Sequence, residues 1–431
     1  MARNTQLTVA AAAVFTLTLA AFLLDIGDPA VMTFDETWYV PTARDWLAGG
    51  AMAHQEHPPL GKLLIAVGMW LFGDDPLGWR AMSALFGAVT VTAVFFWCVA
   101  LSGEVAQASW AAAIAFFGGA IYVQARIAML DIFLMAFCAL ALAFFTFSIK
   151  ESDVRRSLAF ALTAGVCLGL AAACKWSGFF LLAGLAAIYL LIVLLRTWRV
   201  RFEDPRPSDF FVTDAWPAMT PLAAVAVFCV APSAAYFAAY LPQIARAGDL
   251  YEIVASHARM FEIMSSPAPP HPYAGKWLTW LWMERPVWYD FSVRGPKWGP
   301  DTPASAIVGL VNPFVLVTGE FAVLLALARW IRRRDRDCLI VAVAFFSQFL
   351  PWSFDPKGQE FFYYYFPATL AFGPALALAV FRGRDKRRPL AATAIMLLAG
   401  ATFLFFLPVW CAGIGVTPAG YDARIWFKSW V

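Results

Sequence analysis

Two neighbouring acidic residues, Asp35 and Glu36, stand in the sequence FDETWY about ten residues beyond an apolar run at 7–24. A carboxylate held beside a membrane surface can take a proton from an acceptor hydroxyl, which is the work of a general base. Adjacent side chains diverge on a helix or a strand, so only one of the two can point at a given atom. We therefore expect one catalytic base here; the alternative is a solvated cap of the preceding helix.

A second motif, HPPLGK, runs from His57 to Lys62. Its two prolines stiffen the chain, and Gly61 permits a sharp turn. Lys62 then opens a short apolar stretch, LLIAVGMWLFG, which we expect to lie in the membrane interface. A lysine there is positioned to meet a phosphate, either of a substrate or of bulk headgroups. His54 lies three residues before His57 with no further His or Cys ligand nearby, so we expect no metal site.

Four ionisable residues stand inside or at the edges of apolar runs, where each costs about 2.5–3.5 kcal/mol and needs a partner or a function. They are Arg80, Arg126, Asp131 and Lys175. Three cations and one carboxylate at headgroup depth suit a lipid phosphate. The alternative is that Arg126 and Asp131 neutralise one another while Arg80 and Lys175 reach toward the interface. Glu320 lies in the middle of a run, where we expect a buried hydrogen bond.

The composition of the chain indicates the class of protein to which these residues belong. Of 431 residues, 61% are hydrophobic and 14% are charged, against roughly 45–50% and about 25% in a soluble domain. The chain is therefore predicted to be an integral membrane protein. A net charge of +3 is too small to indicate a nucleic-acid partner. The seven cysteines form no CxxC pair, which argues against a disulfide framework or a zinc site.

A helix that spans a membrane needs about 20 mostly apolar residues. The apolar runs of this chain that approach this length predict an all-α bundle of about eleven transmembrane helices. The predicted spans are 7–24, 78–101, 107–123, 127–149, 158–173, 177–195, 217–241, 305–331, 338–352, 361–381 and 389–411. A cytoplasmic N-terminus places every multi-basic cluster on the inner side, at 150–157, 196–216, 332–337 and 382–388, as the positive-inside rule requires. An alternative for the first run is a signal peptide, which leaves residue 25 onward outside the cytoplasm as well.

The outer segments of this topology are loop 25–77, loop 242–304 and the tail 412–431, all within one domain spanning 1–431. All four histidines of the chain lie in the two loops. We therefore expect the chemistry on the outer face. The second loop is rich in aromatic residues, among them Trp277, which could pack against a sugar or a peptide or could form an interfacial aromatic belt.

Several motifs in register resemble the protein O-mannosyltransferase family of the GT-C superfamily. They are FDE, HPPLGK, WRAMSALFG, RIAMLD, CKWSG, HPYAGKW with RPVWY, QFLPW and FFYYYFP, followed by the C-terminal YDARIWFKSW. The resemblance runs over almost the whole chain in the family's order. Two features depart from the fungal and animal members. A loop of 63 residues has no room for their MIR module, and FFYYYFP replaces the more usual Tyr-His-Tyr-Phe, so the form looks bacterial.

The resemblance implies transfer of mannose from polyprenyl-phosphate-mannose to Ser or Thr of exported proteins, with inversion and without a metal or other cofactor. It implies a bacterial plasma membrane, an active site outside the cytoplasm, and membrane lipids and a protein in transit through the secretion machinery as partners. Asp35 matches the catalytic acidic residue and Glu36 its neighbour. The expected donor-side residues are His57, Lys62, Arg80, Arg126, Asp131 and Lys175, and His271 and Trp277 are expected on the acceptor or sugar side.

Two other functions remain open at this point. One is a related lipid-linked transferase that modifies a glycolipid such as lipid A. The other is a polyprenyl-lipid transporter, although transporters usually show paired repeats and broken helices at the membrane midplane. The unusual ionisable residues of this chain gather instead on one face, which favours an enzyme.

Overall fold

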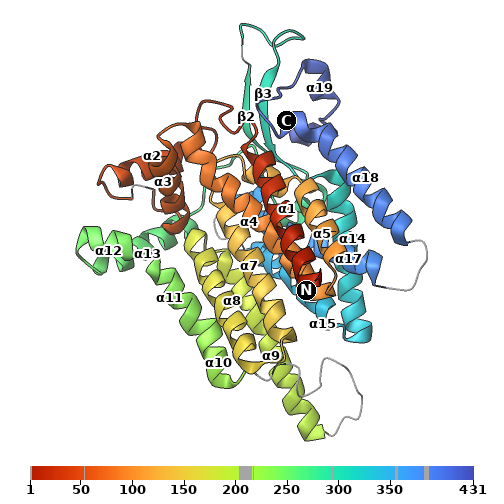
Figure 1. Cartoon of the computed structure of the whole chain (residues 1–431). Coiled ribbons are helices and arrows are strands. Elements are labelled where there is room, and N and C mark those ends of the chain that lie inside the picture. The colour runs from red at the N-terminus through yellow and green to blue at the C-terminus, as the bar shows by residue number, and fades with distance from the viewer. Residues whose placement is uncertain are drawn as a thin grey trace.

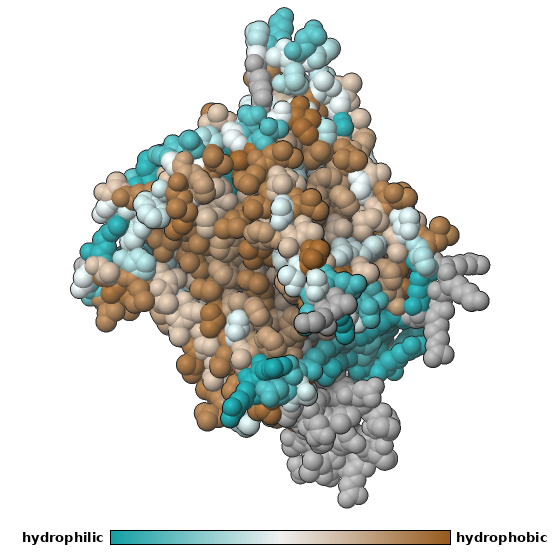
Figure 2. All heavy atoms as spheres, viewed as in Figure 1, coloured by the Kyte–Doolittle hydropathy of each residue, from teal (hydrophilic) through white to brown (hydrophobic). Residues whose placement is uncertain are grey.

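The computed structural model describes residues 2–431 apart from 53, 203–215, 217, 294, 355–357 and 383–387. Most of the predicted inner segments 196–216 and 382–388 therefore lie outside the described residues. The described chain is a bundle of helices with α2, α3, β2, β3 and α19 gathered at one end (Figure 1). Hydrophobic side chains dominate the middle of the face seen in Figure 2, and hydrophilic side chains gather toward its two ends. This distribution is the one that a membrane-spanning bundle requires.

Eight helical segments among the described residues are long and apolar enough to cross a membrane. They are α1 (Ala2–Leu23), α4 (Pro76–Ser102), α7 (Asp131–Lys150), α8 (Val154–Cys174), α10 (Pro221–Val225) continued through α11 (Ala231–Ala238), α14 (Pro313–Arg333), α15 (Arg336–Phe349) with a 3-10 extension to Phe354, and α18 (Arg388–Phe406) with a 3-10 extension to Val409. A ninth forms if Phe362–Thr369 and α17 (Phe372–Phe381), which are bent by 42° at their break, count as one span. The multi-pass membrane fold is confirmed, and the number eleven stays a prediction.

Two of the predicted spans form apolar helices shorter than a full crossing. The run 107–123 is divided at Gly118 and Gly119 into α5 (Val105–Phe117) and α6 (Ala120–Gln124). Gly119 has a φ of +82°, and a Cβ there would lie 2.7 Å from Trp410. The 13 residues of α5 cover only about 20 Å at 1.5 Å per residue. The apolar part of α9 (Gly178–Phe202) covers Gly178–Leu194.

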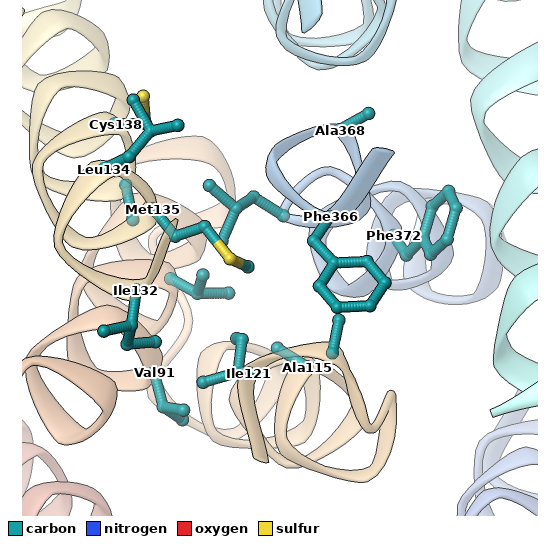
Figure 3. Packing of buried hydrophobic residues seen from close by; sticks show 14 of the residues in the cluster. Val91, Ala115, Ile121, Ile132, Leu134, Met135, Cys138, Phe366, Ala368 and Phe372 are labelled. Carbon is teal, nitrogen blue, oxygen red and sulfur yellow. The ribbon is translucent and has the colours of Figure 1, made fainter. Parts of the chain in front are cut away.

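The centre of the bundle is a close-packed apolar core. Helices α4, α7 and α8 pack against one another, and α1 lies against α4. Figure 3 shows side chains of α4, α7 and α16 (Phe366–Thr369) meeting in this core, among them Val91, Met135 and Phe366. All three are at most 1% exposed. This core fixes the start of α7, and with it Asp131, relative to the outer segments.

The first outer segment folds into two helices. The apolar stretch after HPPLGK forms α3 (Leu60–Phe72), so the predicted helix is confirmed, and it leaves Trp70, Leu71 and Phe72 exposed at its end. A second helix, α2 (Glu36–Leu47), begins directly after Asp35 and was not predicted. Helices α2 and α3 pack against each other, and α3 packs against α4. The carboxylate of Asp35 is thereby fixed at the start of a helix and not on an open loop.

The second outer segment contains α12 (Leu241–Ala247) and α13 (Tyr251–Ser265), followed by short strands. Strand β1 (Ala274–Gly275) pairs antiparallel with β4 (Glu360–Phe361), and β2 (Val287–Val293) pairs antiparallel with β3 (Ala304–Gly309). The expectation that a helix starts at 305 is wrong, because β3 occupies 304–309 and α14 begins at Pro313. The tail forms α19 (Pro418–Asp422) beside these strands (Figure 1).

Candidate active site

Asp35 lies at the start of α2 and is held by the next turn of that helix. The hydroxyl of Tyr39 donates a hydrogen bond to Oδ2 of Asp35 at 3.2 Å. Burial raises the pKa of Tyr39 well above its usual value, so this hydroxyl stays protonated. Burial also raises the pKa of Asp35 to about 6; the positive charge of Lys175 opposes this shift, and the negative charge of Asp131 adds to it. A carboxylate with that pKa is a suitable general base near neutral pH.

Glu36 points away from Asp35 into a closed network. Its Oε1 and Oε2 accept hydrogen bonds from Nε and Nη2 of Arg80, each at 2.7 Å, and both side chains are fully buried. Glu36 also accepts from the backbone N–H of Ala128 at 2.8 Å and of Thr33 at 2.9 Å. The pair therefore connects α4 to the segment before α2 and to the segment before α7.

Arg80 uses its remaining donors on backbone oxygens of the first outer segment. Its Nη1 donates to the carbonyls of Ile26 and Pro29 at 3.0 and 2.9 Å, and its Nη2 donates to that of Val31 at 3.0 Å. Together with the two bonds to Glu36, these engage all five N–H groups of the guanidinium. This geometry argues against the predicted phosphate contact of Arg80 and the predicted catalytic role of Glu36, since neither has capacity left for a substrate.

Arg126 is held by groups of the protein, and its predicted contact with a phosphate stays a prediction. Its Nη1 donates to the carbonyl oxygens of Phe22 at 2.9 Å and Ala21 at 3.3 Å, at the end of α1, and its guanidinium lies 5.3 Å from the centre of the Tyr122 ring. A cation at a helix C-terminus satisfies carbonyls that have no partner within the helix. The alternative of an Arg126–Asp131 pair is wrong, because Asp131 pairs with Lys175.

Asp131 and Lys175 form a buried ion pair at the wall of a cavity. Nζ of Lys175 lies 2.9 and 3.0 Å from the two carboxylate oxygens of Asp131, and 5.2 and 5.3 Å from the ring centres of Tyr363 and Tyr364. The cavity has a volume of about 310 Å³. Its lining combines charged and polar groups with apolar ones, notably Glu56, His57, Asp131, Lys175, Leu134, Phe180, Phe261 and Met264. Such a lining suits an amphipathic ligand with a charged head.

The HPPLGK motif closes one side of this region. Lys62 is 1% exposed, and its Nζ donates to the backbone carbonyls of His54 and His57 at 2.6 and 2.7 Å. Burial lowers the pKa of Lys62 to about 7. Lys62 therefore shapes the loop that presents His57 to the cavity, and the predicted phosphate contact of Lys62 itself stays a prediction. The ring of His57 lies 6.5 Å from that of Tyr39, which holds Asp35.

The two residues expected on the acceptor side lie in the second outer segment. His271 packs edge-on against Phe361 of β4 at 5.1 Å, and burial lowers its pKa. Trp277 packs against Phe349 at 4.8 Å. Neither lines the cavity beside Asp131. Glu320 accepts a hydrogen bond from the hydroxyl of Tyr365 at 2.7 Å, as expected for a carboxyl inside a span.

The cavity also uses aromatic residues that sequence reasoning did not single out. Trp176 lines it, and its indole N–H donates to the hydroxyl of Tyr236 at 3.0 Å. That hydroxyl lies 2.8 Å from Nε2 of His257, whose Nδ1 lies 2.7 Å from the carbonyl of Ile253. The network fixes Trp176 between α8, α11 (Ala231–Ala238) and α13. The only signal in the sequence for this role of Trp176 is its position next to Lys175 in CKWSG.

Family comparisons cover nearly the whole chain in two adjacent parts. Residues 12–242 match the family described as dolichyl-phosphate-mannose-protein mannosyltransferase, and residues 249–430 match the C-terminal four-TMM region of protein-O-mannosyltransferase. A polyprenol-phosphate-mannose–protein mannosyltransferase of Corynebacterium glutamicum is 29% identical over 461 aligned residues, which cover 92% of this chain and 88% of that relative.

Solved structures share the fold. A protein O-mannosyltransferase complex of S. cerevisiae bound to the sugar donor superposes with a TM-score of 0.78 at 14% identity, covering 99% of this chain and 92% of the yeast one. The predicted GT-C type fold is thus confirmed. The glycolipid alternative has weaker support: an undecaprenyl phosphate-alpha-4-amino-4-deoxy-L-arabinose arabinosyl transferase of Pseudomonas savastanoi pv. phaseolicola is 28% identical over 198 residues, covering 43% of this chain and 35% of that one.

Proposed function

Because this chain belongs to the dolichyl-phosphate-mannose-protein mannosyltransferase family, we propose that it transfers mannose from a polyprenyl-phosphate-mannose donor to Ser or Thr hydroxyls of proteins. The name of the Corynebacterium glutamicum relative specifies that donor and a protein acceptor. We place the reaction at the outer face of a bacterial plasma membrane, on proteins in transit through the secretion machinery. The one-sided basic clusters of the sequence support this orientation.

The observation that supports the assignment of the site is the proximity of Asp35 to the Asp131–Lys175 pair. Phe34, which precedes Asp35, packs against the ring of Tyr363 at 5.8 Å, and Nζ of Lys175 lies 5.2 Å from the centre of that same ring. The charges of Asp131 and Lys175 also act on the Asp35 carboxyl. Lys175 lines the cavity beside apolar side chains of α7, α9 and α13. A polyprenyl phosphate combines a charged head with an apolar tail, and this lining offers a partner to each.

In the proposed reaction the acceptor hydroxyl oxygen attacks the anomeric carbon of the donor mannose. The bond between that carbon and the phosphate oxygen breaks, and the phosphate departs with the electron pair. Asp35 takes the hydroxyl proton as the new bond forms. Attack opposite the departing phosphate inverts the anomeric configuration. Because the leaving group is already an anionic phosphate ester, a fixed cation is sufficient to stabilise it, and the proposal includes no metal.

Each residue around Asp35 has a separate task in this account. Lys175 stabilises the departing phosphate, and Asp131 holds Lys175 in place through both carboxylate oxygens. The Glu36–Arg80 pair fixes the backbone that carries Asp35. His57 lines the cavity on the side of the HPPLGK motif and is proposed to contact the donor head.

A transfer assay with purified protein tests this function. Radiolabelled polyprenyl-phosphate-mannose is incubated with a Ser/Thr-containing peptide, with the same peptide carrying Ala at those positions, and with lipid A. We expect label in the Ser/Thr peptide alone, an inverted anomer in the product, and unchanged rates after dialysis against EDTA. Label in lipid A and none in peptide would contradict the proposed acceptor.

A further inference from the structure

A second cavity lies at the edge of the bundle, between α14, α17 and α18. Its volume is about 620 Å³ and it is open to the surroundings. Helix α18 stands at the edge of the bundle beside α14 and α17 (Figure 1). The cavity shares no lining residue with the cavity beside Asp131. We refer to it as the α14–α18 groove.

Three arginines line the end of the groove formed by the last turns of α14 and α17 and the first turn of α18. They are Arg329, Arg382 and Arg388. Arg329 donates through Nη1 to the carbonyl of Leu378 at 2.8 Å, and Arg388 donates through Nη1 to that of Phe381 at 2.8 Å. These two bonds hold both guanidinium groups against the end of α17 and leave most of their N–H donors for other partners.

The three arginines differ in whether a carboxylate pairs with their positive charge. Arg382 forms ion pairs with Asp335 and Asp337. Within the described part of the chain, neither Arg329 nor Arg388 forms an ion pair. Nη2 of Arg388 is moreover buried and has no hydrogen-bond partner there. A guanidinium N–H without an acceptor is costly, so an anionic group fits this end of the groove.

Apart from Thr318, the rest of the groove is apolar. Val317 and Phe321 of α14 line it and are 64% and 63% exposed, and Leu376, Ala391 and Ile395 complete its walls. Val317 and Arg329 lie twelve residues apart on one helix, which is about 18 Å at 1.5 Å per residue. The groove thus offers a cationic end and a long apolar wall, the two features of a phospholipid-binding site.

We propose that the α14–α18 groove binds one anionic phospholipid of the membrane leaflet on the side of the basic clusters. Arg329 and Arg388 bind its phosphate, because planar guanidinium groups present paired donors to phosphate oxygens. One acyl chain follows α14 along Val317 and Phe321. Arg382 closes the end of the groove while it remains paired with Asp335 and Asp337.

Native mass spectrometry of the detergent-purified full chain tests this site. Dioleoylphosphatidylglycerol and dioleoylphosphatidylcholine are titrated in parallel. The parental protein is expected to retain one phosphatidylglycerol at least tenfold more tightly than phosphatidylcholine. The double variant Arg329→Gln/Arg388→Gln is expected to lose that preference. The control Arg332→Gln/Arg333→Gln removes two exposed charges from the same helix end outside the groove and is expected to keep it.

A third variant separates the site from misfolding. Ala391→Trp fills the groove from an exposed position and leaves the arginines intact. It is expected to abolish retention of phosphatidylglycerol while its thermal unfolding without lipid stays close to that of the parent. Equal retention by Ala391→Trp, or by the Arg329/Arg388 double variant, would overturn the proposal. So would a groove occupied by a second copy of the chain, seen as a dimer that Ala391→Trp dissociates without changing lipid retention.

Discussion

Arg80 donates two parallel hydrogen bonds to Glu36, from Nε to Oε1 and from Nη2 to Oε2, each at 2.7 Å and both within the protein interior. This pair distinguishes the two adjacent carboxylates by their contacts, whereas the sequence distinguished them only through the family resemblance. Glu36 holds the backbone, whereas Asp35 is close enough to the Asp131–Lys175 pair for the charges of both partners to act on its carboxyl. We therefore propose a supporting role for Glu36 and keep Asp35 as the candidate base.

Glu36→Gln is expected to destabilise the fold. Breaking a buried ion pair costs about 3–5 kcal/mol, because the remaining charge has no counterion. The measurement is thermal unfolding followed by fluorescence-detected size exclusion. Glu104→Gln, which changes an exposed carboxylate at the start of α5, is the matched control and should unfold like the parent. If Glu36→Gln also unfolded like the parent and had lost activity, Glu36 would have a catalytic role after all.

Lys175→Met is expected to weaken use of the donor. A hydrogen bond to a charged group contributes about 1.5–3 kcal/mol, so kcat/KM for polyprenyl-phosphate-mannose should fall roughly 10- to 150-fold. Lys175→Arg should recover part of the loss, because it restores the cation. The control Lys297→Met removes an exposed lysine of the second outer segment. Donor kinetics unchanged in folded Lys175→Met would show that the ion pair with Asp131 is only structural.

The pH dependence of transfer should report the pKa of Asp35. Burial raises that pKa from 3.8 to about 6, and only the deprotonated carboxylate accepts a proton. Activity should therefore be full well above pH 6 and should fall about tenfold per pH unit below it. Measurements of kcat/KM between pH 4.5 and 8 test this. A profile that stays flat down to pH 4.5 would exclude Asp35 as the titrating base.

The orientation of the bundle can be tested with reporter fusions. Reporters at residues 153 and 335 should read as cytoplasmic, and those at 54 and 270 as external, because the basic clusters of the sequence lie on one side. A cytoplasmic signal at residue 54 would place Asp35 on the opposite face and contradict the proposed acceptors.

The sequence predicted the helical membrane fold well because long apolar runs have few other structures available to them. The predicted helix boundaries were wrong where a strand and a helix have similar composition. The run ASAIVG at 304–309 is apolar apart from Ser305 and forms a strand, yet periodicity cannot separate it from the helix that follows. Helix α2 contains Pro41 and little apolar periodicity, so nothing local favoured a helix after Asp35.

The sequence indicated which residues need a partner or a function more reliably than it indicated what each of them does. An ionisable residue in a span demands a partner, and that rule selected Arg80, Arg126, Asp131 and Lys175. Which partner each one meets depends on contacts between segments far apart in the chain. Arg126 meets the end of α1, more than 100 residues away, and no pattern near Arg126 indicates it.

The central claim is that Asp35 is the base, and Asp35→Asn tests it most directly. Asparagine keeps the size of the side chain and one oxygen acceptor for Tyr39 but cannot take the acceptor's proton. Asp45→Asn, on an exposed position of the same helix, is the matched control. Transfer to a Ser/Thr peptide by purified Asp35→Asn should fall about 10²–10⁴-fold, with donor binding and thermal stability close to those of the parent and full activity in Asp45→Asn. Near-parental transfer by folded Asp35→Asn would contradict the account.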